Sequence, residues 1–172
     1  MEKEFILKIP PQLHNKMLEP TEYVMKEMAY LDTFQPSNPF IHEAAFFQGI
    51  QLFQPWAQQN VKICVEKIMA EWQQLKLDIQ RSITEQNKKE TQQIMKKGIA
   101  YFLESLYWTN ELPVSFEAGI ISKEIKIKPI NVEERMAFIV SRLTGYHSFK
   151  QLDELFKELQ KQFAVKMSKR KS

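Results

Sequence analysis

Histidine and cysteine are the residues of this 172-residue chain most suited to metal binding or nucleophilic chemistry, and it contains three histidines and one cysteine. His42 and Glu43 begin a pattern like the H-E-x-x-H zinc motif, but Phe46 stands where the second histidine would be. We therefore predict no metal site. Cys64 lies inside a long helical pattern, where a small core residue is more common than a reactive thiol.

Pairs of carboxylates are the other common source of acid–base chemistry. Glu133 and Glu134 fall in the first turn of an expected helix, where their charge stabilises the positive end of the helix dipole. Catalysis would need acids from separate elements that converge in a cleft, and no spacing in the sequence indicates such a pair. No serine lies in a G-x-S-x-G pattern. We therefore expect no enzyme, no catalytic residue and no cofactor.

A non-enzymatic protein-interaction or accessory module is then the leading hypothesis, with another protein as the partner. Aromatic residues at the end of a helix usually pack a loop onto the core, but they also anchor interfaces. Arg135 and Arg142 are seven residues apart on one expected helix, so they project from similar faces and would pair with acids or bind an anion. The candidate interaction surface comprises Trp108, Asn110, Arg135, Arg142, Tyr146 and His147.

Positive charge gathers in two places and supports an alternative, a nucleic-acid-associated accessory protein. Residues 166–172 carry four positive charges, which leaves −1 on the rest of the chain given the total of +3. The candidate basic patch comprises Lys88, Lys89, Lys96, Lys97, Lys169, Arg170 and Lys171. The competing interpretations are a solvated end for the tail, and neutralisation of the lysines at 88–97 by Glu85 and Glu90.

Apolar spacing predicts the elements that must position these residues. Residues 56 to about 84 show a continuous helical stripe, which resumes between 94 and 106; we favour a helical hairpin over one long helix, with Asn87 and Glu90 as a capping pair. Shorter helices are predicted over 20–32, 42–53 and 131–143, the last capped by Asn131 and stopped by a left-handed Gly145. A further helix opens at Ser148, with a buried seam to Met167 that packs internally or dimerises.

The fold class is therefore mainly α: one helical-bundle-like domain of five to seven helices over residues 1–165, followed by a flexible basic tail over 166–172. Residues 5–9 and 124–128 are short, β-branched or alternating, and would pair as a two-stranded ribbon. The amino terminus does not read as a secretory signal, and no apolar run approaches 18 residues, so we expect a cytoplasmic protein without membrane insertion.

The carboxy-terminal third resembles a known family. Three segments carry the resemblance: WTNELPV at 108–114, KPINVEERMAFIVSR at 128–142 and YHSFKQLDELFKELQKQFA at 146–164. They are similar to the YpoC-like family of small bacterial proteins. The resemblance implies a helical, cytoplasmic bacterial protein and assigns no reaction.

Overall fold

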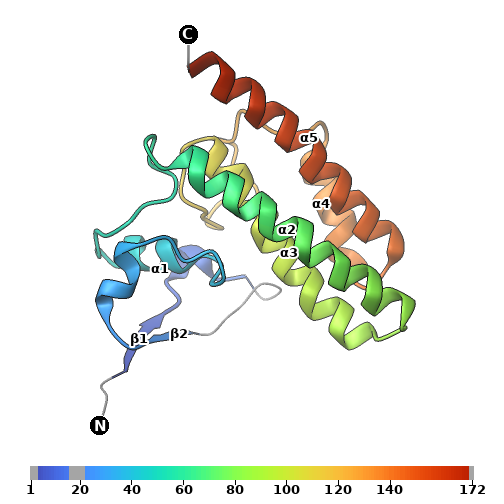
Figure 1. Ribbon diagram of the computed structural model, residues 1–172, viewed down its shortest axis with the longest axis horizontal. Coiled ribbons are helices and arrows are strands. Elements are labelled where there is room, and N and C mark those ends of the chain that lie inside the picture. The colour runs from blue at the N-terminus through green and yellow to red at the C-terminus, as the bar shows by residue number, and fades with distance from the viewer. Residues whose placement is uncertain (1–3, 16–21, 171–172) are drawn as a thin grey trace.

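A long helical hairpin and a third long helix form the main body of the protein, and a smaller amino-terminal unit packs beside it (Figure 1). The computed structural model describes residues 4–15 and 22–170. Within them lie strands β1 (Phe5–Lys8) and β2 (Glu22–Met25) and helices α1 (Ile41–Phe47), α2 (Val61–Thr84), α3 (Lys88–Thr109), α4 (Val132–Ser141) and α5 (Tyr146–Arg170), with short 3-10 turns at Pro11–Leu13 and Met28–Asp32. The mainly α fold class is confirmed.

The hairpin of α2 and α3 closes through a three-residue turn, as the sequence predicts. The Asn87 side chain accepts a hydrogen bond from the Glu90 amide at 3.2 Å and donates to the Glu90 carboxylate at 3.2 Å, which confirms the capping pair. Behind the turn, the hydroxyls of Ser82 and Thr91 are buried and lie 2.7 Å apart. This hydrogen bond between the two hydroxyls joins α2 to α3 near the hairpin turn, where the packed side chains are polar rather than apolar.

Helices α2, α3 and α5 meet around Trp72. A Cβ on Gly98 of α3 would lie 2.7 Å from the Trp72 ring, so only glycine permits this approach of α3 to α2. The Trp72 ring stacks on Phe156 of α5 with centroids 4.4 Å apart, and its indole N–H donates to Asp153 at 3.1 Å. The indole of Trp72 thus contacts α5 in two ways, by stacking on Phe156 and by a hydrogen bond to Asp153.

Helix α5 differs from its prediction at both ends. Its predicted seam is buried throughout: Phe149, Leu152, Phe156, Leu159, Phe163 and Met167. The helix begins at Tyr146 rather than at Ser148, and it continues to Arg170. The prediction of a flexible tail is therefore wrong for residues 166–170, because Met167 packs into the core and keeps the helix docked. Residues 171–172, including Lys171, lie outside the described residues.

Around α4, three local predictions are wrong. Residues 124–128 do not form a strand, because Lys126 and Ile127 donate their amides to the Asn110 side chain, at 3.0 and 2.8 Å, rather than to a neighbouring strand. Asn131 is the residue before α4, which confirms the predicted start of this helix, but it has a left-handed φ of 53° and its side chain makes no capping bond, so the predicted cap is wrong. Gly145 is not among the described residues with positive φ.

The true partner of β1 is β2, in an antiparallel pair that joins Leu7 to Tyr23 and Ile6 to Val24. The helix predicted over 20–32 is thus wrong for residues 22–25: Tyr23 and Met25 are buried while Glu22 and Val24 are exposed, which is the period of a strand. Farther along the same range, Met28–Asp32 forms a short 3-10 helix. Helix α1 is shorter than the predicted 42–53.

Residues Ile41, His42, Glu43, Ala44 and Ala45 of α1 are all buried. Within the described residues, no helix combines the length and the apolar content that crossing a bilayer would require.

Candidate functional site

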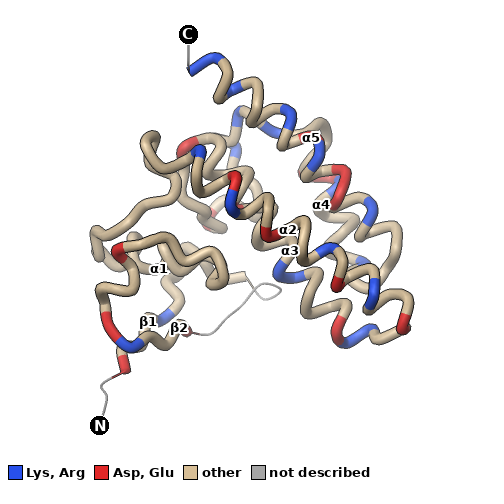
Figure 2. Tube along the Cα trace, in the orientation of Figure 1, with Lys and Arg blue, Asp and Glu red and all other residues tan. Residues whose placement is uncertain are grey.

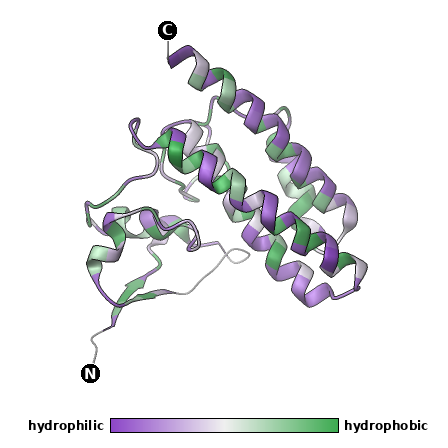
Figure 3. Cartoon of the chain, viewed as in Figure 1, coloured by the Kyte–Doolittle hydropathy of each residue, from purple (hydrophilic) through white to green (hydrophobic). Residues whose placement is uncertain are grey.

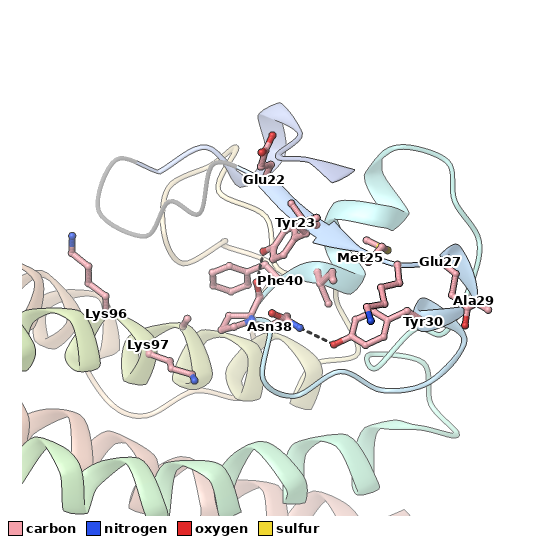
Figure 4. A pocket seen from close by; sticks show the side chains of 15 residues that line it. Glu22, Tyr23, Met25, Glu27, Ala29, Tyr30, Asn38, Phe40, Lys96 and Lys97 are labelled. Atoms are coloured by element: carbon pink, nitrogen blue, oxygen red, sulfur yellow. Dashed lines mark hydrogen bonds between the residues drawn. The ribbon is translucent and has the colours of Figure 1, made fainter. Parts of the chain in front are cut away.

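A groove of about 790 Å³ lies between β2 and the middle of α3 (Figure 4). Its strand side is formed by every residue from Glu22 to Glu27, and its helix side by Lys96, Lys97 and Ala100. The remaining lining residues are Ala29, Tyr30, Asn38, Pro39, Phe40 and Ile41. The volume falls in the range typical of ligand pockets, roughly 300–1,000 Å³.

The strand side of the groove is an open sheet edge. Among the described residues the sheet has two strands, so β1 covers one edge of β2 and no strand covers the other. No residue of β1 lines the groove, whereas consecutive residues of β2 all do. In an antiparallel pair every second residue directs its N–H and C=O away from the partner. The groove therefore runs along backbone groups that are able to pair with another extended chain.

Hydrogen bonds fix the floor of the groove. The Tyr23 hydroxyl donates to the carbonyl of Pro39, and the Asn38 side-chain amide donates to the Tyr30 hydroxyl at 2.9 Å. Tyr23 is buried, and burial is the main cause that raises the pKa of its hydroxyl. The phenol therefore stays protonated and acts as a structural donor.

The helix side of the groove carries two positive charges. Lys96 is half-buried and Lys97 is exposed, with the Lys97 ammonium 5.7 Å from the centre of the Tyr101 ring. Glu22 and Glu27 lie on the opposite, strand side. The two sides of the groove thus differ in charge, basic on α3 and mixed on β2.

Two buried carboxyl groups lie behind the groove, Glu43 from α1 and Glu104 from α3. One Glu43 oxygen, Oε2, accepts the Trp108 indole N–H at 2.7 Å and the Val114 amide at 3.1 Å. The Glu104 Oε2 accepts the Phe40 amide at 3.3 Å. In each carboxyl group the other oxygen, Oε1, is buried without a hydrogen-bond partner among the described residues.

Burial changes the acidity of both groups. It raises the pKa of Glu43 to about 7, opposed by the bonds from Trp108 and Val114. Burial also raises the pKa of Glu104 well above its usual value, and the neighbouring charge of Glu43 raises it further. Like charges in an apolar site disfavour double ionisation, so the pair retains at least one proton at neutral pH.

The histidine and cysteine nearby are structural. The ring of His42 accepts a hydrogen bond from the Gln35 amide at 3.0 Å, and burial lowers its pKa to about 4. Burial raises the pKa of the Cys64 thiol to about 12. Over residues 4–15 and 22–170, no group of three or more His, Cys, Asp or Glu side chains is arranged to hold a metal ion. Neither side chain lines the groove.

The pair Glu43–Glu104 was not predicted from the sequence. The acidic pair that the sequence does suggest, Glu133 and Glu134, lies in the first turn of α4 as expected. A signal was present, because Glu104 interrupts a stretch from Ala100 to Trp108 that is otherwise apolar on nearly every face, Ser105 excepted. A carboxyl group in a helix with no polar face must be buried.

The predicted interaction surface does not come together as one surface. Trp108 is 0% exposed, so its inclusion is wrong, because its indole is needed to bond buried Glu43. Asn110 is half-buried and holds the segment at 126–127. Arg135 is half-buried and donates to Glu158 at 2.6 Å.

Three members of that surface, Arg142, Tyr146 and His147, are exposed at the junction of α4 and α5. The Tyr146 and His147 rings lie 6.0 Å apart, and the Arg142 guanidinium lies over the ring of Phe138. These residues remain a candidate surface patch.

The predicted basic patch is also divided (Figure 2). Lys88 and Lys89 lie in the first turn of α3, about 12 Å along the helix from Lys96 and Lys97. Lys169 and Arg170 lie at the carboxy-terminal end of α5, at the opposite end of the molecule from the hairpin turn. The basic residues therefore form separate clusters.

A helical hairpin packed on a long third helix, with a strand-edged groove beside it, defines a small mainly α protein. The chain belongs to the YpoC-like protein family, whose model matches residues 62–171. A Bacillus subtilis (strain 168) protein with the name Uncharacterized protein YpoC is 38% identical over 94 residues, which covers 54% of this chain and 57% of that protein. No solved structure matches the chain.

Proposed function

We propose that this chain is a non-enzymatic interaction module that binds an extended segment of a partner protein in the groove between β2 and α3. The open edge of β2 is the observation that carries the proposal. An extended peptide that adds to a sheet edge gains main-chain hydrogen bonds along its whole length. Such an edge also tends to pair with other chains unless it is covered.

The groove supports a partner with acidic side chains on one face. A bound strand alternates its side chains, so one set contacts α3, where Lys96 and Lys97 supply positive charge. The other set of side chains of the bound strand lies nearer to Glu22 and Glu27, whose negative charges disfavour acidic residues there. We therefore expect segments in which acidic residues alternate with apolar or neutral ones.

The lining of the groove favours binding over catalysis. It contains no histidine, cysteine or serine, and the carboxyl groups with raised pKa, Glu43 and Glu104, are absent from it. Tyr23 keeps its proton and bonds Pro39. Among the described residues of the lining there is thus no serine or cysteine nucleophile with a histidine base beside it.

A random library of linear heptapeptides displayed on phage tests the proposal. We expect selection against the full chain to enrich sequences of alternating acidic and apolar residues. Replacement of the groove lysines, K96E/K97E, should then weaken the best peptide by about tenfold or more. The matched variant K88E/K89E changes the same charge on the same helix outside the groove and should leave affinity unchanged.

Methylation of peptide amides separates strand addition from simple charge attraction. N-methyl groups on one alternating set of amides should abolish binding, while those on the other set should be tolerated, because only one set faces β2. The absence of enriched peptides would overturn the proposal. So would equal losses in K96E/K97E and K88E/K89E.

The nucleic-acid alternative in its sequence-derived form is less well supported. This alternative uses both the lysines of α3 and the basic carboxy-terminal end, and the two lie far apart in the structure (Figure 2). Glu90 lies near the lysines at the start of α3, and its negative charge reduces the net positive charge there. Glu90 also pairs with Arg81 at 3.2 Å.

A further inference from the structure

The carboxy-terminal end of α5 forms a second hollow, of about 470 Å³, with the segment at 126–128. Of the eight described residues that line it, five are basic and none is acidic: Lys126, Lys128, Lys166, Lys169 and Arg170, with Ile127, Gln162 and Val165. The hollow lies apart from the groove, and no residue lines both. It is therefore a second, independent candidate site.

Side-chain hydrogen bonds hold the two sides of the hollow in place. Asn110 at the end of α3 bonds the backbone at 126–127 through both its amide oxygen and its amide nitrogen. The Gln162 side chain donates to the Lys128 carbonyl at 2.8 Å and so joins α5 to the same segment. The basic residues thus project from backbone that is fixed on both sides.

Two of the cations are oriented by groups that carry no charge. The Lys166 ammonium donates to the carbonyl of Thr109. The Arg170 guanidinium donates to the Gln58 carbonyl at 2.8 Å and contacts the Met167 sulfur at 3.6 Å. A neutral acceptor positions a cation but leaves its charge in place, unlike the carboxylate of Glu133, which pairs with Lys128 at 2.7 Å.

Burial of Lys166 has an electrostatic cost. It is the main cause that lowers the pKa of the Lys166 ammonium; the charge of Glu111 opposes this effect and the charge of Arg170 adds to it. A bound anion would favour the charged form of Lys166 in the same way as Glu111 does.

We infer that this basic hollow binds phosphate groups. Several ammonium and guanidinium groups around a small hollow suit an anion with several charged oxygens more than a single carboxylate. No described residue of the lining is aromatic, so a base has no ring to stack on and a nucleic acid would be held through its backbone and without sequence preference. Free polyphosphate and the nucleic-acid backbone share this chemistry, and the test distinguishes them.

The test uses the full chain with two probes at about 50 mM salt: a labelled single-stranded oligothymidylate of about twelve nucleotides, and inorganic tripolyphosphate. The variant K126Q/K169Q removes two exposed charges from the hollow, and K88Q/K89Q removes two exposed charges from the start of α3. Thermal melts by circular dichroism verify that both variants fold. We expect K126Q/K169Q to weaken probe binding about tenfold and K88Q/K89Q to leave it nearly unchanged.

The two probes assign the source of the phosphate. If the oligonucleotide binds with a steep salt dependence that is less steep in K126Q/K169Q, the phosphate belongs to a nucleic-acid backbone. If tripolyphosphate alone binds, the ligand is a free polyphosphate. The inference is overturned if neither probe binds at this salt concentration, or if both variants lose affinity equally. Selected groove peptides should bind K126Q/K169Q normally, so this result is independent of the proposed function.

Discussion

The substitution Glu43→Gln is expected to stabilise the protein increasingly as the pH rises. The glutamine carbonyl can still accept the indole N–H of Trp108 and the amide of Val114, but the buried side chain no longer ionises. Because the folded-state pKa of Glu43 is raised, the folded state holds its proton where the unfolded chain has lost it. Its contribution to stability is therefore complete below pH 4.5 and is lost as the pH rises to about 7.

The expected magnitude follows from the difference between these two values. At about 1.4 kcal/mol for each pH unit, a pKa raised from 4.5 to about 7 costs wild type about 3 kcal/mol between pH 4 and pH 8. The lowered pKa of His42 acts oppositely: its penalty is present at low pH and disappears as the pH rises through about 4 to 6.5. The wild-type curve alone thus mixes the two effects, whereas the difference between E43Q and wild type removes that of His42 and reports Glu43 together with its coupling to Glu104.

Urea denaturation of both proteins at pH steps from 4 to 8 measures this difference. We expect the free energy of unfolding of E43Q to exceed that of wild type by an amount that grows by about 3 kcal/mol across the range. The control Glu133→Gln makes the same chemical change at an exposed residue whose pKa is lowered by Lys128, so its effect should be small and of opposite sign. Parallel curves for E43Q and wild type would refute the reasoning.

Three other variants or probes test the packing of the helical body. Gly98→Ala places a methyl group against Trp72 and should lower the free energy of unfolding by about 1–3 kcal/mol in urea; wild-type stability would contradict the close approach of the helices. Asn110→Ala removes the acceptor for the Ile127 amide, which should exchange hydrogen faster by NMR, and unchanged protection would count against this anchor. The buried Cys64 should react with a thiol reagent only after unfolding, so rapid reaction of the native protein would be the contrary result.

The long helices could be predicted because each buries one continuous stripe. In α2 the stripe includes Val61, Val65, Ile68, Trp72 and Ile79, all buried as the spacing predicts. The turn was predictable for a local reason: Asn87 and Glu90 satisfy each other's hydrogen bonds within four residues. Both signals, the apolar stripe and the capping pair, depend only on residues close together in the sequence.

The ribbon and the site depend on contacts between distant residues, which short patterns do not encode. Residues 124–128 alternate like a strand, but the side chain of Asn110 supplies their hydrogen bonds. Residues 22–25 form a strand that the sequence pattern does not distinguish from a helix, because four residues are too few to separate a period of two from mixed helical spacing. The partners of Glu43 lie 65 and 71 residues away, so no local spacing marks that carboxyl group.

The same long separations bear on how the chain folds. The hairpin of α2 and α3 closes over a three-residue turn, whereas the hydrogen bonds of Glu43 form only after 65 or more residues have been brought together. Loop-closure entropy opposes contacts of the second kind until much of the chain is ordered. The helical hairpin should therefore form in the folding nucleus and α1 should dock late. A change at Glu43 would then alter how fast the native protein opens and leave the rate of folding nearly constant.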